Sequence, residues 1–164
     1  MSSKKVVGFT CGAFDILHAG HAMMLKEAKE SCDYLIVGVQ GDPSIDRPGK
    51  NKPVQTYVER QTMVSAIKWV DEIVLYDTEA DLLDLLNKLK PDVRIIGADW
   101  KGKPYTGYQL PMRVVFNSRN HGYSTSELRQ RIMTAELNKT IQTHLMPHGG
   151  VHVQNAINSL LNKK

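Results

Sequence analysis

Two histidines three residues apart, His18 and His21, carry the strongest chemical signal in the sequence. They close the stretch Gly12-Ala13-Phe14-Asp15-Ile16-Leu17-His18-Ala19-Gly20-His21, which follows an apolar segment and leads into a helical pattern. The free amides of a helix N-terminus bind phosphate, and Gly20 lets a ligand approach the backbone. Histidines placed there can donate hydrogen bonds to phosphate oxygens whose charge grows as a bond forms. Half of a zinc site is the alternative, but neither cysteine has the spacing of a second half-site.

A second group of anion-binding residue types runs from Arg119 to Ser126. Arg119 precedes the hydroxyls of Ser124, Thr125 and Ser126, and a glycine-containing turn joins the two. Arginine, free amides and hydroxyls together form an anion cradle, although hydroxyls at a helix start are more often simple caps. Two such cradles on one sheet suit a polyphosphate lying between them.

A third, weaker signal is the basic loop Arg47-Pro48-Gly49-Lys50-Asn51-Lys52-Pro53, with Arg60 in the helical pattern behind it. Lysines in a loop rich in glycine and proline are usually a solvated surface. A loop in this place can also close over phosphates and supply positive charge late in a reaction.

Apolar segments alternate with helical patterns along the chain, and this alternation predicts the elements that position these residues. Strands are expected at 6–10, 34–39, 73–75, 93–97 and 113–116. Helices are expected at 19–31, around Met63, Ile67 and Val70, around Leu82, Leu86 and Leu89, and behind a capping box of Ser124 and Glu127, burying Leu128, Ile132 and Ala135. The order predicts an α/β fold, a doubly wound, Rossmann-like parallel sheet of five strands with helices on both faces. Ligands of such folds sit beyond the carboxyl ends of the strands, where each motif above is expected.

Length and composition favour one compact domain, placed at 1–136, with a short helical or extended tail at 137–164. In the tail, Val153, Ile157, Leu160 and Leu161 could form a last amphipathic helix. Hydrophobic residues make up 41% of the chain and charged residues 23%, which is ordinary for a globular protein. No apolar run is long enough to span a membrane, and the two cysteines form no disulfide framework, so a reduced cytoplasmic protein is expected.

The net charge of +4 is concentrated in the tail, where Lys139, Lys163 and Lys164 stand without any acidic residue. The remaining body is nearly balanced. A nucleic-acid-binding domain usually needs a concentrated basic face, so nucleic acid is not expected as a partner.

The chain resembles the small cytidylyltransferases of the His-x-Gly-His nucleotidyltransferase superfamily, and among them the glycerol-phosphate cytidylyltransferases. The resemblance covers about residues 5 to 135 and rests on Gly12–Asp15, His18–His21, Arg60, Val70–Ile73, Gly97–Lys103 and Ser124-Thr125. The histidine motif is shared by the whole superfamily, whereas Gly97-Ala98-Asp99-Trp100-Lys101-Gly102-Lys103 favours the cytidylyl group. Residues 78–81 depart from the pattern, because they are acidic where the glycerol-phosphate enzymes tend to place a lysine near the acceptor.

The resemblance implies an enzyme in which an acceptor phosphate attacks the α-phosphorus of CTP in line and releases pyrophosphate. His18, His21, Lys50, Lys52 and Arg119 are then the catalytic residues, and Lys50 and Arg60 bind the acceptor. Further nucleotide contacts are implied for Thr10, Cys11, Gly12, Ala13, Phe14, Asp15, Gly97, Asp99, Tyr123, Ser124 and Thr125. No metal-binding side chain is implied, because Mg²⁺ would be bound through the triphosphate.

Other functions stay open from the sequence. An adenylyltransferase acting on a sugar phosphate is the first alternative, because heptose-phosphate adenylyltransferases have a very similar Asp-Ile-Leu-His-Ala-Gly-His stretch. A nucleotide-binding module without catalysis and a zinc-binding module are the others. A homodimer is expected, since soluble oligomers are most often two-fold. The acceptor is a phosphorylated small alcohol or sugar, with glycerol 3-phosphate first.

Overall fold

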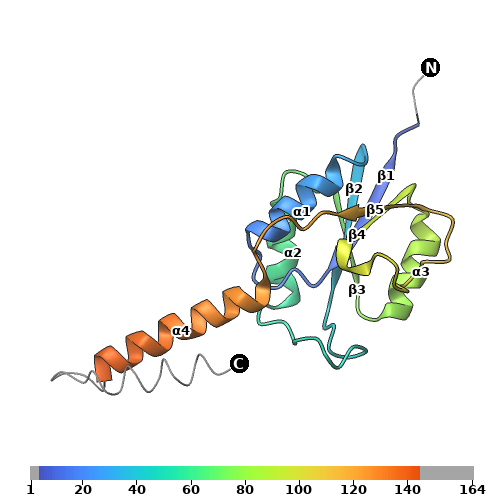
Figure 1. Cartoon of the computed structure of the whole chain (residues 1–164). Helices are drawn as coiled ribbons and strands as arrows, with labels where there is room; N and C mark the ends of the chain where they lie inside the picture. The colour runs from blue at the N-terminus through green and yellow to red at the C-terminus, as the bar shows by residue number, and fades with distance from the viewer. Residues whose placement is uncertain (1–3, 145–164) are drawn as a thin grey trace. The chain divides into compact units, whose positions relative to one another are not determined.

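A computed structural model describes residues 4–144, which fall into two compact units divided between Tyr123 and Ser124 (Figure 1). The first unit contains five strands, three α-helices and one short 3₁₀ helix. In chain order they are β1 (Val7–Gly12), α1 (Ala19–Lys29), β2 (Tyr34–Gln40), α2 (Tyr57–Ser65), β3 (Glu72–Tyr76), α3 (Glu79–Leu89), β4 (Val93–Gly97), η1 (Ala98–Trp100) and β5 (Arg113–Asn117). The second unit contains α4 (Thr125–His144).

The five strands form one parallel sheet in the order β3-β2-β1-β4-β5, which confirms the predicted fold class. The chain moves outward from β1 to β3 on one side and then crosses back to β4 and β5 on the other. The strand order therefore reverses between β1 and β4. In open α/β sheets, ligands bind at this point beyond the carboxyl ends of the strands.

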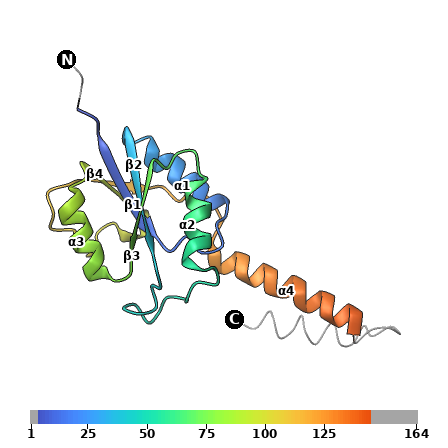
Figure 2. The ribbon, with the colours of Figure 1, turned by 180° about the vertical axis from the view of Figure 1, so that it is seen from behind.

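Helices cover both faces of the sheet, with α1 and α2 on one and α3 on the other (Figure 2). On the first face Leu25, Ala28 and Val64 pack against Leu35, Val37 and other strand residues. On the second face Leu82 and Leu86 pack against Phe9, Ile36 and Tyr76. Neighbouring residues of β2 thus enter opposite cores, as the continuous apolar run of that strand predicts.

The second helix is shorter than its apolar spacing predicts. It ends at Ser65, so Ile67 and Val70 lie beyond it, and Met63 is 44% exposed. A capping box of Thr56 and Glu59 fixes its start, and from that start Arg60 and Val64 face the core. Ile67 and Val70 still pack against the core, but from the connection to β3. The prediction extended the helix too far because Ile67 and Val70 are packed against the core although they lie outside the helix.

In the second unit, the predicted cap at Ser124 is confirmed, because its Oγ accepts the N–H of Glu127 at 3.2 Å. The expected burial of Ile132 and Ala135 is wrong, since both residues are exposed. The helix continues as one element to His144. It therefore runs through residue 136, where the sequence suggests a domain boundary. Among the apolar residues described in this helix, Ile141 is buried. The last expected helix, Val153 to Leu161, lies outside the described residues.

Candidate active site

The two histidines of the motif stand at the start of α1, next to the carboxyl end of β1. His18 is the N-cap residue, and its Nδ1 accepts the N–H of Gly20 at 3.1 Å. The Nδ1 of His21 accepts the N–H of His18 at 3.4 Å, which completes a reciprocal cap. The rings are stacked, with centroids 4.0 Å apart. Because an accepting Nδ1 carries no proton, both neutral rings hold their proton on Nε2.

The surroundings keep these rings uncharged. Burial, together with the neighbouring His18 and Arg119, lowers the pKa of His21 to about 3, against a smaller opposing effect of Asp15. Burial also lowers the pKa of His18, with His121 adding to the effect. At neutral pH both side chains are therefore neutral donors through Nε2–H. Such donors suit phosphate oxygens at a helix N-terminus.

A third histidine, His121, joins this pair through Gly20. A Cβ atom on Gly20 would lie 2.8 Å from Cε1 of His121 and 2.9 Å from Cε1 of His18. Only glycine therefore fits between the two rings. His121 lies in the segment that follows β5, and the sequence does not assign it to the site. Its proximity depends on the sheet order, which no local pattern specifies.

The loop between β1 and α1 is fixed by two buried charged side chains. Asp15 is 7% exposed, and its Oδ1 accepts the N–H groups of Val54 and Gln55, each at 3.0 Å. Arg60 is 2% exposed and donates to four backbone carbonyls, those of Ala13 (2.7 Å), Gly41 (2.6 Å), Gln55 (3.2 Å) and Gln40. These bonds position the loop that carries the histidines. Direct contacts of Asp15 with nucleotide and of Arg60 with acceptor stay predictions.

The same loop holds backbone in a sparsely populated conformation. Phe14 and Ile16 have φ angles of 52° and 48°, in the left-handed region that non-glycine residues rarely adopt. The Phe14 side chain is buried in the core, and the N–H of Ile16 donates to Oε1 of Gln55 at 2.7 Å. Because the Phe14 side chain is occupied by the core, only its backbone and that of Ala13 remain to line a ligand.

On the other side of the strand reversal lie three more predicted residues. Gly97 ends β4, Asp99 lies in η1, and Arg119 follows the end of β5. Asp99 Oδ1 lies 3.4 Å from Nη1 of Arg119, and both side chains are about half exposed or more. A Cβ atom on Gly97 would collide with the Asp99 carboxylate, so glycine permits this approach. Arg119 has a φ angle of 49°. The ion pair orients the guanidinium beside the end of the sheet, as an anion cradle requires.

A cavity of about 700 Å³ opens at the carboxyl edge of the sheet. Its lining reaches from Tyr76 at the end of β3 to Asn117 at the end of β5. Six of the predicted nucleotide-binding residues line it, namely Thr10, Cys11, Gly12, Gly97, Asp99 and Arg119. Arg47 of the basic loop also lines it, together with Glu79, Arg94 and Thr106, to which the sequence assigns no role in the site. A charged residue within the apolar strand Val93–Gly97 is the signal that could have revealed Arg94.

The predicted site residues that have not yet been described lie on exposed segments or in the second unit. Lys50 and Lys52 are exposed in the loop between β2 and α2, and Tyr123 is 52% exposed with its ring centroid 5.7 Å from that of His121. Ser124 and Thr125 begin the second unit, and their contact with a nucleotide stays a prediction. In the part of the chain that the structure describes, no three His, Cys, Asp or Glu side chains are grouped to hold a metal ion. A zinc site is therefore unsupported among these residues.

Comparison with known proteins identifies the family of the chain. A family model described as cytidylyltransferase-like matches residues 9–131. The chain belongs to the cytidylyltransferase-like family. The matched range includes all three histidines of the site.

Relatives of this cytidylyltransferase-like chain include the bifunctional protein HldE of Campylobacter curvus, 40% identical over 134 residues. That match covers 81% of this chain but 28% of HldE, so the chain spans little more than a quarter of that relative. A lipopolysaccharide core biosynthesis protein from Thermoplasma volcanium is 26% identical, with a TM-score of 0.52, over 80% of this chain and 89% of that one.

The fold is shared more widely. A bifunctional NMN adenylyltransferase/ADP ribose pyrophosphatase from Francisella tularensis is 14% identical, with a TM-score of 0.54, over 79% of this chain and 42% of that one. This likeness concerns the fold alone. Within residues 4–144, no helix has the length and apolar character to cross a membrane.

Proposed function

We propose that the protein transfers a nucleotidyl group from ATP to the phosphate of a phosphorylated sugar or polyol. The stacked, neutral pair His18 and His21 at the start of α1 is the observation that carries this proposal. A phosphate oxygen of the acceptor attacks the α-phosphorus, the bond from that phosphorus to the bridging oxygen breaks, and pyrophosphate leaves. No covalent enzyme intermediate is needed, so positioning and charge account for catalysis.

The side chains of this site divide the work. The Nε2–H groups of His18 and His21 donate to α-phosphate oxygens and stabilise the charge that builds up during attack. The N-terminus of α1 directs its partial positive charge toward the same group. Arg119, oriented by Asp99, binds the outer phosphates, and Lys50 and Lys52 approach from the loop after β2. Mg²⁺ enters as part of the nucleotide substrate, bound by phosphate oxygens.

Two observations favour ATP as the nucleotide. The stretch from Asp15 to His21 resembles that of heptose-phosphate adenylyltransferases, and the chain is 40% identical to the bifunctional protein HldE. The likeness to a lipopolysaccharide core biosynthesis protein supports a sugar phosphate as acceptor.

CTP is the second candidate, favoured by one specific observation. The segment Gly97–Lys103 resembles the cytidylyl group, and Gly97, Asp99 and Trp100 line the cavity where a base would lie. A site built for one base penalises the other when polar groups are left unpaired. Glycerol 3-phosphate remains the acceptor to test with this nucleotide.

The experiment measures pyrophosphate release with ATP and CTP under Mg²⁺, against a panel of sugar phosphates and glycerol 3-phosphate. Higher kcat/KM for ATP with the best acceptor supports the proposal, and higher kcat/KM for CTP supports the second candidate. Tight binding of either nucleotide without pyrophosphate release from any acceptor would favour a non-catalytic binding module. His18→Ala serves as the control that separates enzyme turnover from background hydrolysis.

A further inference from the structure

Arg94 is a buried charge on the floor of the cavity. It is 4% exposed and lines the cavity from β4, three residues before the end of that strand. Its Nη2 lies 3.2 Å from Sγ of Cys11, and its guanidinium carbon lies 4.8 Å from the ring centroid of Phe9. Its Nε and Nη1 have no hydrogen-bond partner among the described residues.

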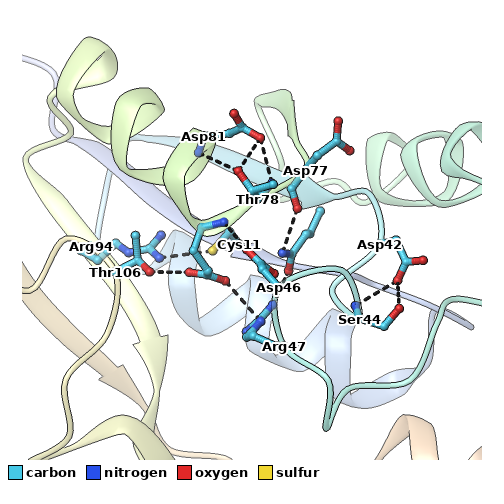
Figure 3. A network of polar contacts seen from close by, with 12 residues as sticks. Cys11, Asp42, Ser44, Asp46, Arg47, Asp77, Thr78, Asp81, Arg94 and Thr106 are labelled. Carbon is cyan, nitrogen blue, oxygen red and sulfur yellow. Dashed lines mark hydrogen bonds and ion pairs between the residues drawn. The ribbon is translucent and has the colours of Figure 1, made fainter.

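The two acidic residues that line the cavity are engaged elsewhere, and Asp99 forms the ion pair with Arg119. Glu79 also lines the cavity, but its carboxylate accepts a hydrogen bond from Thr106 and lies 3.3 Å from Nε of Arg47. At the cavity wall the contact of Arg94 with Cys11 is separate from the contacts that Thr106 and Arg47 make with Glu79 (Figure 3). A thiol and an aromatic face are weak partners for a guanidinium. Burying a charge without a counter-charge is costly, so an anion is the expected complement.

We propose that Arg94 binds an oxyanion of the acceptor substrate on the α3 side of the cavity. This inference rests on the proposed function, because it assigns part of the same cavity to the second substrate. The nucleotide residues Gly97, Asp99 and Arg119 stand at the β4–β5 end, whereas Glu79 and Arg47 stand toward β2 and β3. Arg94 lies between these groups. A guanidinium whose Nε and Nη1 both lack a partner can donate a charge-assisted hydrogen bond to a phosphate or carboxylate oxygen.

The cavity wall suggests what else the acceptor carries. The hydroxyl of Thr106 and the carboxylate of Glu79 can exchange hydrogen bonds with hydroxyl groups. The acceptor is therefore a phosphorylated sugar or polyol, with an oxyanion on Arg94 and hydroxyls near α3. Two sources fit the oxyanion, the phosphate that reacts and a second acidic group on the same molecule.

A direct binding experiment tests Arg94 without relying on turnover. The side-chain Nε–H signal of Arg94 is observed by NMR in ¹⁵N-labelled protein and assigned by its loss in Arg94→Lys. Addition of inorganic phosphate is expected to shift this signal with saturation. The signal of Arg113, an exposed arginine on β5 that donates to the backbone carbonyl of Ser31 at 3.0 Å, serves as the internal control and stays in place.

Kinetics then identify the source of the oxyanion. In Arg94→Met the KM for the acceptor is expected to rise about 10- to 100-fold, with kcat and the KM for the nucleotide within about threefold of wild type. A rise for every monophosphate acceptor assigns the reacting phosphate to Arg94, and a rise only for acceptors with a second acidic group assigns that group. Arg113→Met is the matched control and should leave both KM values unchanged.

The outcomes separate this inference from the proposed function. An unshifted Arg94 signal at saturating phosphate, together with an unchanged acceptor KM in Arg94→Met, overturns the inference while turnover itself stands. Absence of turnover with any acceptor overturns the proposed function, and a saturable shift of Arg94 would then still establish an oxyanion site. If Arg94→Met does not fold, the wild-type titration and the kinetics of Arg94→Lys decide the question.

Discussion

The low pKa of His21 makes its protonation a measurable cost to folding. Its pKa is about 3 in the folded protein, against about 6.5 for an unperturbed histidine, because burial and nearby positive groups disfavour the imidazolium. Below pH 6.5 the unfolded chain takes up a proton that the folded chain does not. Each pH unit then costs about 1.4 kcal/mol. Between pH 7 and pH 5, His21 alone should lower the free energy of unfolding by about 2 kcal/mol.

The variant His21→Asn isolates this effect, since asparagine keeps an acceptor for the His18 N–H but cannot titrate. Urea unfolding is followed by fluorescence at pH 7 and pH 5, and both tryptophans, Trp69 and Trp100, lie in the first unit. The wild type should lose about 2 kcal/mol more than the variant over this range. A difference between wild type and His21→Asn below about 0.5 kcal/mol would refute a neutral His21, because ordinary surface substitutions vary that much.

Three further predictions concern catalysis, the loop and assembly. His18→Ala and His21→Ala should each lower kcat for pyrophosphate release about 10²–10³-fold while circular dichroism shows a folded protein, and near wild-type turnover in either would contradict their assignment. Asp15→Asn should lower the free energy of unfolding by about 1.5–3 kcal/mol, because two backbone N–H groups lose a charged acceptor, and an unchanged urea midpoint would count against this clamp. Sedimentation should give a homodimer at micromolar concentration, where a monomer would refute the prediction, and truncation after Ala135 tests the part played by the C-terminal segment.

The sheet is predictable from the sequence because its central strands, such as β2 and β4, are buried on both faces. The run from Tyr34 to Val39 contains no polar residue, and the structure places it as β2 at the second position of the sheet. The end of α2 is not predictable from spacing, since Ile67 and Val70 keep a helical interval after the helix has stopped. Apolar spacing reports which residues are buried, whereas the capping box of Thr56 and Glu59 reports where the helix begins.

The site is predictable only as far as it is local. His18 and His21 lie within one turn, so their spacing alone places them together at the start of α1. Their contact with His121, and the approach of Arg94 to Cys11, join segments more than 80 residues apart. Those contacts follow from the sheet order, in which β4 crosses back to lie beside β1. No motif in the sequence specifies which strand occupies that place.

The polar groups of the candidate site are of two kinds, and they suit different stages of the proposed reaction. Arg119 and Arg94 carry permanent charges, which attract the triphosphate and the acceptor equally well before and during attack, so they contribute mainly to binding. His18 and His21 are neutral donors, and a neutral N–H bond gains strength as charge grows on the phosphate oxygen that it contacts. Arg119 also helps keep His21 neutral. Lysine in place of His21 would therefore add ground-state binding without this selectivity, and the low pKa of the histidine is part of how the site would favour the transition state.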